Sequence, residues 1–197
     1  MRIAYQPLAL AATLCLIPTA GTLAQKSAGA PIPRTLRPAL EAVKASNPWV
    51  LEQQQSICEI PAPPFKEGDR AAELKRRFEA LGLVNVRIDG EGNVIGERPG
   101  SGSGPTVVLS GHLDTVFPEG TDVKVQREGT RFTAPGIADD CRGLAVVLGV
   151  ARALADTKMK TPGTILFVGT VGEEGAGNLR GVRYLFEKEL PEYLIGF

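Results

Sequence analysis

The chain has 197 residues, of which 43% are hydrophobic, and its 22 basic residues balance 22 acidic residues to a net charge of zero. These values are typical of an ordinary single globular domain. No run of lysine and arginine is interleaved with aromatic residues, so we do not expect nucleic acid as a partner.

Residues 1–24 have the pattern of a secretory signal peptide. A positive charge at Arg2 precedes an apolar stretch at residues 8–17, and small residues end at Ala24, just before Gln25. A membrane anchor is the alternative, but a span needs about 20 apolar residues and this stretch is much shorter. We therefore expect cleavage after Ala24, a secreted or periplasmic mature protein, and no stable membrane span.

Export would leave two cysteines, Cys58 and Cys141, in the mature chain. An oxidising compartment would permit a bond between them. A zinc-ligand role for Cys141 lacks a second cysteine at short spacing. We favour a small buried hydrophobic role for Cys141, and whether the two cysteines are bonded stays open.

The segment after the predicted cleavage site changes from a linker to a helix. Residues 25–38 are rich in alanine, proline, serine and glycine, so residues 25–47 are expected to be a linker and N-terminal segment that joins the fold near Leu40. Asn47, followed by a proline, predicts the start of a helix that runs toward Ile57 and is stopped by the proline-rich run after it.

A second helix and a hairpin are predicted next. Asp69 is expected to cap the helix, apolar residues follow at helical spacing on one face, and Gly82 ends it. Residues 84–88 alternate as a strand, residues 89–93 have turn composition, and residues 94–95 continue the hairpin. This part of the chain is interpreted as scaffold.

The only histidine of the chain follows an apolar run that predicts a central strand. Residues 106–109 are apolar on both faces, and His112 lies at the carboxyl end of this strand, where α/β sheets bind ligands. Asp114 would point to the same side of the chain as His112 and could hydrogen-bond the second imidazole nitrogen. Such a bond raises the basicity of the imidazole toward a metal. The alternatives are a buried histidine with local hydrogen bonds and an aspartate that only caps a turn.

Two adjacent aspartates precede the next predicted helix. Asp139 and Asp140 stand directly before apolar residues at helical spacing over residues 144–154. A helix cap explains one aspartate, because aspartate is a favoured N-cap and its charge suits a helix N-terminus. The other aspartate is left free to bind a metal.

Two adjacent glutamates follow a second apolar strand. Residues 164–168 form this run, and Glu173 and Glu174 lie in the glycine-rich loop after it. A phosphate-binding loop is not expected, because these carboxylates would repel the anion. The remaining alternative is a solvated acidic turn at the surface.

Together these elements predict an α/β fold with a mixed, mostly parallel sheet flanked by helices. A right-handed crossover between two parallel strands brings His112 and Glu174 to one edge of the sheet. Imidazole with carboxylate ligands suits zinc, and a bridging carboxylate such as Asp139 could hold two ions about 3.5–4 Å apart. One of the two glutamates would then be free to act as a general base.

Three motifs in this order resemble a known family. The segments SGHLDTVFP (110–118), GIADDCRG (136–143) and GEEGAGN (172–178) are similar to the di-zinc metallopeptidase and amidohydrolase family of aminoacylase, glutamate carboxypeptidase and peptidase T. The resemblance covers about residues 48–197. It implies a zinc-exopeptidase-like catalytic domain with a smaller lid domain inserted later in the chain.

The resemblance also implies roles for the site residues. His112 and Glu174 would each bind one zinc ion, and Asp139 would bridge both, often with a cis peptide to the next residue. Asp114 would orient the histidine, and Glu173 would be the general base. The implied reaction is hydrolysis of a small peptide or N-acyl amino acid by a hydroxide that bridges the metals, with Co²⁺ or Mn²⁺ as substitutes for zinc.

The ligand set departs from that of the family. Two zinc ions need about five protein ligands, and only His112, Asp139 and Glu174 qualify. We therefore expect residues 48–197 to be the N-terminal part of the catalytic domain, without the lid and with little activity alone. Residues 193–197 predict the start of a further strand, and the absent lid would be the place for a homodimer contact.

Other functions remain open. One alternative is a non-catalytic exported α/β domain, or an inactive truncated relative. Another is a deacylase rather than a peptidase, because the two share these motifs, and only a substrate panel separates them.

Overall fold

The structure of the protein is a computed structural model that describes residues 32–189 and 191–197. The signal peptide predicted for residues 1–24 lies outside the described residues. None of the described helices is long and apolar enough to span a membrane.

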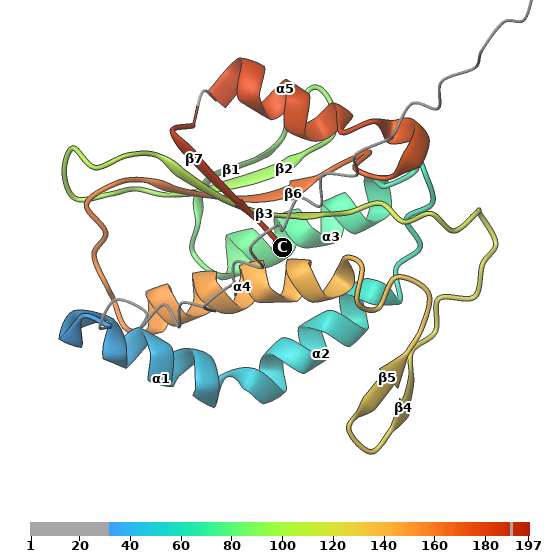
Figure 1. Ribbon diagram of the computed structural model, residues 1–197, viewed down its shortest axis with the longest axis horizontal. Coiled ribbons are helices and arrows are strands. Elements are labelled where there is room, and N and C mark those ends of the chain that lie inside the picture. Colours follow the sequence, from blue (N-terminus) through green and yellow to red (C-terminus); the bar gives the residue numbers. More distant parts are fainter. Residues whose placement is uncertain (1–31, 190) are drawn as a thin grey trace, which may run out of the picture. The chain divides into compact units, whose positions relative to one another are not determined.

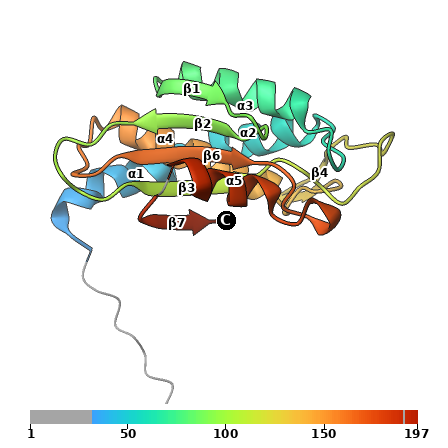
Figure 2. The same cartoon turned by 90° about the horizontal axis from the view of Figure 1, so that it is seen from above.

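A five-stranded mixed sheet forms the centre of the described part of the chain (Figures 1 and 2). Its spatial order is β1-β2-β6-β3-β7, and β2 alone runs opposite to the other four strands. The strands are β1 (Val84–Ile88), β2 (Val94–Arg98), β3 (Val107–His112), β6 (Ile165–Thr170) and β7 (Tyr193–Gly196). The predicted fold class is therefore confirmed.

Helices cover both faces of this sheet. Four helices lie on one face and α5 lies on the other (Figure 1). The helices are α1 (Arg37–Ala45), α2 (Asn47–Cys58), α3 (Gly68–Ala80), α4 (Cys141–Asp156) and α5 (Arg180–Glu189). Their apolar stripes bury both sheet faces, which explains why β3 and β6 are apolar on both sides.

The core divides into two clusters, one on each side of the sheet. The larger cluster joins α2, α3 and α4 to the sheet and includes Leu74, Phe78, Leu144, Leu148 and Phe167, all fully buried. The smaller cluster places Leu185 of α5 against the opposite faces of β2, β3 and β6. These two layers hold the carboxyl ends of the strands in fixed positions.

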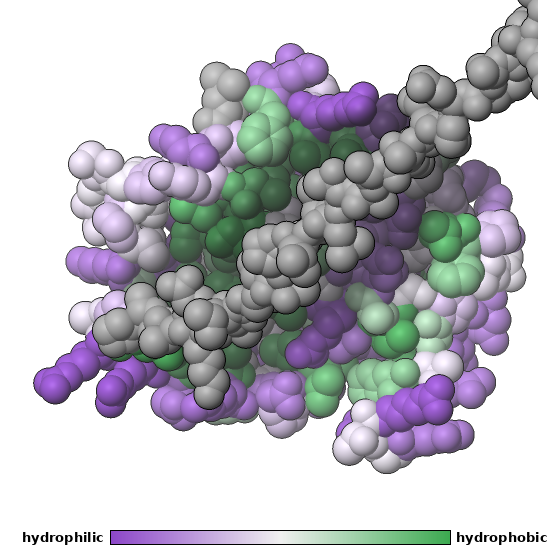
Figure 3. All heavy atoms as spheres, in the orientation of Figure 1, coloured by the Kyte–Doolittle hydropathy of each residue, from purple (hydrophilic) through white to green (hydrophobic). Residues whose placement is uncertain are grey.

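The register of the two central strands brings their ends together. β3 and β6 are parallel, and His112 pairs with Thr170, the last residue of β6. The loops that follow both strands therefore start at the same edge of the sheet. β7 lies at the other side of β3, and its Tyr193 and Ile195 are exposed. Figure 3 shows hydrophobic residues gathered over the region where β7 lies in Figure 1.

Several elements differ from those predicted. Residues 34–36 form a 3-10 turn and α1 follows it, so a segment predicted as linker is helical from Arg37, with Pro38 at the helix start where its missing N–H is tolerated. The cap position of α3 is Glu67, and Asp69 lies in the first turn instead. A short hairpin of β4 (Gln126–Glu128) and β5 (Arg131–Thr133), and α5, were not predicted.

The two cysteines are bonded, a point that the sequence left open. Cys58 and Cys141 are 83 residues apart in the chain, yet their Cα atoms lie 5.4 Å apart and a disulfide joins them. The packing of α2 against α4 brings the end of one helix to the start of the other. Cys141 is also fully buried within the larger core cluster, as expected.

Candidate metal centre

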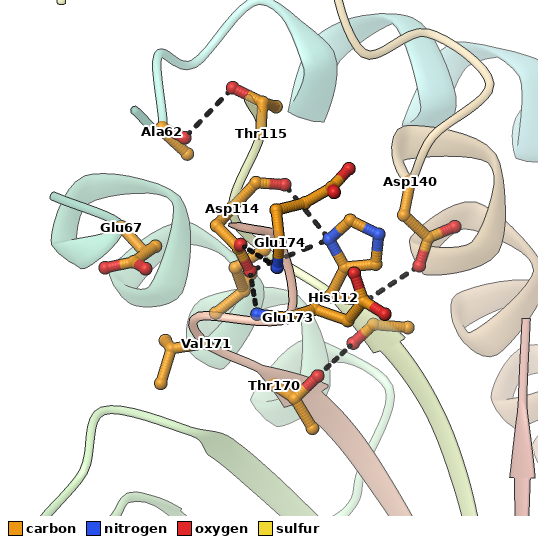
Figure 4. Close-up of polar contacts among 12 residues, drawn as sticks. Ala62, Glu67, His112, Asp114, Thr115, Asp140, Thr170, Val171, Glu173 and Glu174 are labelled. Carbon is orange, nitrogen blue, oxygen red and sulfur yellow. Dashed lines mark hydrogen bonds and ion pairs between the residues drawn. The ribbon is translucent and has the colours of Figure 1, made fainter. Parts of the chain in front are cut away.

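His112, Asp114, Glu173 and Glu174 lie close together at one edge of the sheet (Figure 4), and Asp139 is within hydrogen-bond distance of the imidazole. His112 ends β3, Asp139 immediately precedes the cap residue of α4, and Glu173 and Glu174 follow β6. These four residues line a cavity of about 400 Å³. Their side chains come from three chain segments that are far apart in sequence.

His112 is held on three sides by aspartates. Its ring Nε2 lies 2.8 Å from Oδ1 of Asp139, and its Nδ1 lies 3.0 Å from the backbone carbonyl of Asp114. Its backbone N–H donates to Oδ2 of Asp140 at 2.7 Å. These contacts fix the imidazole with Nε2 facing the carboxylate of Asp139.

The electrostatic surroundings favour a positive charge at the histidine. Burial by itself lowers the pKa of His112, but the contact with Asp114, the charge of Asp140 and the hydrogen bond to Asp139 outweigh it and raise the pKa to about 9. In the metal-free protein the imidazole is therefore cationic at neutral pH. The same carboxylates would favour a metal cation, which would have to displace the proton from the imidazole.

Asp114 contacts the histidine less directly than the sequence suggested. Its carboxylate is 3.6 Å from Nδ1, and its two oxygens instead accept the backbone N–H groups of Glu173 at 3.0 Å and Glu174 at 2.9 Å. Burial raises the pKa of Asp114, but the histidine and these two N–H groups lower it to a net value below normal. Asp114 therefore anchors the loop that carries both glutamates.

Asp140 is the aspartate that caps the helix. Its Oδ1 accepts the N–H of Gly143 at 2.8 Å, as expected for an N-cap residue, and burial raises its pKa to about 6. A Cβ atom at Gly143 would overlap this carboxylate, so only glycine fits there. Asp139 is left with its side chain 75% exposed toward the cavity, and the peptide bond between the two aspartates is cis.

The glutamates complete a group of metal-ligating atoms. One ligand atom each from His112, Glu173 and Glu174 lies within 4.8 Å of the others. Partial burial, followed by the charge of Asp139, raises the pKa of Glu174. Both glutamates face the same point, so the geometry does not by itself separate a ligand from a base.

Two arginines that the sequence interpretation missed support the site. Arg70 is fully buried and donates to the backbone carbonyls of Cys58, Ile60 and Leu113, the last of which lies between His112 and Asp114. Burial lowers the pKa of Arg70 to about 10, against the opposing charge of Asp114. Arg70 precedes Leu74 by four residues and Phe78 by eight, so it lies on the apolar face of α3. This helical spacing could have indicated from the sequence that Arg70 is buried.

Arg180 supports the glutamate loop from the other side. It pairs with Glu67 at 2.8 Å and Glu91 at 2.9 Å. Its side chain covers Gly172, whose positive φ of 59° and lack of a Cβ allow this close approach. No local pattern in the sequence indicated this contact.

Comparison with known proteins agrees with the motifs. Residues 108–197 match the model of peptidase family M20/M25/M40. The chain belongs to this family. Carboxypeptidase G2 of Pseudomonas sp. (strain RS-16) is 30% identical over 210 residues, which cover 100% of this chain and 48% of that protein. The resemblance to this family of peptidases and amidohydrolases is thus confirmed, and zinc as its metal stays a prediction.

Two further similar proteins are named as a desuccinylase and an aminopeptidase. Succinyl-diaminopimelate desuccinylase of Corynebacterium glutamicum is 30% identical over 159 residues, covering 81% of this chain and 41% of that protein. The crystal structure of aminopeptidase PepT from Bacillus cereus matches with a TM-score of 0.65 and 26% identity, over 75% of this chain and 42% of that one. The chain thus spans less than half the length of these relatives.

Proposed function

We propose that this chain is the metal-binding part of a hydrolase of peptide or N-acyl amide bonds that uses two zinc ions. The observation that carries the proposal is the convergence of His112, Glu173 and Glu174 within 4.8 Å, with Asp139 at hydrogen-bond distance from the imidazole. Membership of a family of amide-bond hydrolases supports the reaction type.

The donor set fits zinc. One imidazole nitrogen and several carboxylate oxygens are ligands that zinc accepts, and Co²⁺ or Mn²⁺ can occupy such sites. Nearby aspartates raise the pKa of His112, and burial followed by the charge of Asp139 raises the pKa of Glu174, so several carboxylates lie close together here. A divalent ion would relieve this repulsion.

We assign the side chains as follows. His112, Asp139 and Glu174 would hold the metal, which when bound polarises the substrate carbonyl and lowers the pKa of water. Glu173 would take a proton from the attacking water and deliver it to the leaving amine nitrogen. Asp114 would keep both glutamates in place through their backbone N–H groups.

The described residues supply only part of a two-ion site. Two tetrahedral zinc ions that share one carboxylate need about five protein ligands, and three side chains are assigned here. We therefore expect residues 25–197 alone to bind metal weakly and to show little turnover. Robust zinc-dependent peptidase activity of residues 25–197 would contradict this expectation.

Metal binding tests the proposal directly. We expect Co²⁺ to bind the folded chain with an absorption spectrum typical of imidazole and carboxylate ligation, and His112→Ala to abolish that spectrum. The matched control Glu187→Gln changes an exposed acid on α5 and should leave the spectrum unchanged. Co²⁺ binding that survives His112→Ala would refute the site, and absence of binding by the complete protein would favour a non-catalytic α/β domain.

The role of Glu173 needs a separate test in the complete protein. Glu173→Gln should retain zinc but lose most turnover, about 100-fold or more, because general-base catalysis contributes at least this factor. Glu187→Gln again serves as the control. Unchanged turnover in Glu173→Gln would assign the base elsewhere. A panel of dipeptides and N-acyl amino acids would separate a peptidase from a deacylase.

We also propose that the protein is exported and cleaved after Ala24. The buried disulfide supports this location, because such bonds persist in oxidising compartments. N-terminal sequencing of the mature protein should start at Gln25. A cytoplasmic protein that retains residues 1–24 would contradict the proposal.

A further inference from the structure

The disulfide lies where two supporting elements meet the candidate metal centre. Cys58 is the last residue of α2, Cys141 is the first residue of α4, and both are fully buried. We infer that this cross-link positions the turn formed by Asp139 and Asp140 against His112. The inference deepens the proposed function. Its statement about metal affinity rests on that function, whereas its statement about the position of the Asp139–Asp140 turn does not.

The turn before Cys141 contacts both the backbone and the ring of His112. Asp140 accepts the backbone N–H of His112 at 2.7 Å, and Asp139 lies 2.8 Å from its ring Nε2. Asp140 also accepts the N–H of Gly143, in the first turn of α4. Since hydrogen bonds weaken beyond about 3.2 Å, a shift of the start of α4 by one ångström relative to β3 would disturb both contacts with His112.

The end of α2 is in turn tied to the strand that carries His112. Arg70 donates to the carbonyl of Cys58 at 3.3 Å and to the carbonyl of Leu113 at 2.7 Å. α2 also reaches the turn through Gln54, whose Nε2 donates to the carbonyl of Ile137 at 2.8 Å. Gln54 also accepts from Arg142, in the first turn of α4, at 3.2 Å. If both cysteines were replaced by alanine, the contacts of Gln54 would be the side-chain hydrogen bonds that still link α2 to this region of the described chain.

A purely global role for the disulfide predicts a different outcome from a positioning role. A cross-link that only lowers the conformational entropy of the unfolded chain would slow hydrogen exchange of all protected amides by the same factor. A positioning cross-link would act most strongly on the amide of His112, which donates to Asp140 across the two segments. The amide of Phe167, in the centre of β6, is the internal reference.

Amide hydrogen exchange of the double variant Cys58→Ala, Cys141→Ala is the test. We expect exchange at His112 relative to Phe167 to rise by about tenfold or more, and Co²⁺ affinity of the folded variant to fall by about tenfold, as when a group supporting a metal ligand is lost. A stabilising osmolyte keeps the variant folded without replacing the cross-link.

Leu154→Ala is the matched control, because it removes a buried side chain at the far end of α4. It should destabilise the protein while leaving the ratio of exchange at His112 and Phe167 within about twofold, since global unfolding exposes all amides alike. An equal ratio in both variants would overturn the inference. A raised ratio only in the double variant, together with no Co²⁺ binding by the wild type, would uphold the positioning role and refute the metal site.

Discussion

Replacing Asp114 with asparagine removes a charge that holds three parts of the site together. The carboxylate is 1% exposed, accepts the backbone N–H groups of Glu173 and Glu174, and lies 3.6 Å from the imidazole of His112. The amide of asparagine has nearly the same shape but only one acceptor oxygen, and it turns an NH₂ donor toward one of the two N–H donors.

The magnitude follows from the bonds that change. A hydrogen bond to a charged acceptor contributes about 1.5–3 kcal/mol, and a neutral one about 1 kcal/mol. Losing one charged bond and weakening the other should lower the free energy of unfolding by about 3 kcal/mol. The glutamate loop would also lose its anchor, so we expect metal affinity to fall by about 10–100-fold.

Urea unfolding followed by circular dichroism measures the stability change, and a Co²⁺ titration of the folded protein measures the affinity. The matched control is Asp156→Asn, the same chemical change at a residue whose side chain is 58% exposed and whose partner, Arg152, lies 3.4 Å away. This control should change stability by less than about 0.5 kcal/mol. A similarly small change in Asp114→Asn would refute the anchoring role.

Two further predictions concern buried cations. Because the imidazole of His112 loses its proton near pH 6.5 in the unfolded chain but only near pH 9 in the folded one, the metal-free protein should lose about 3 kcal/mol of stability as pH rises through this window. Urea unfolding with a chelator present measures this slope, and His112→Asn should flatten it; an unchanged slope would assign it to another group. Arg70→Met leaves three backbone carbonyls without donors and should lower the free energy of unfolding by about 3 kcal/mol. Arg70→Lys should recover part of this loss, and equal stability of both variants would contradict the hydrogen-bonding role.

The parts of the fold that were predicted correctly depend on local patterns. β1 spans Val84–Ile88 as expected, α2 begins within one residue of the prediction, and Asp140 caps α4. Apolar periodicity and capping preferences act over a few residues and can therefore be read along the chain. α1 was missed because its composition resembles a linker.

The candidate site likewise combines residues that the sequence indicated with contacts that it did not indicate. The sequence by itself determined which side chains could take part, because imidazole and paired carboxylates after two apolar strands have few other uses. Only the tertiary structure decided that Asp114 bonds the glutamate backbone, that Arg70 supports Leu113, and that Cys58 reaches Cys141. These contacts join residues that are 43 to 83 positions apart. Such distances are bridged only by the packing of helices on the sheet, which no local pattern encodes.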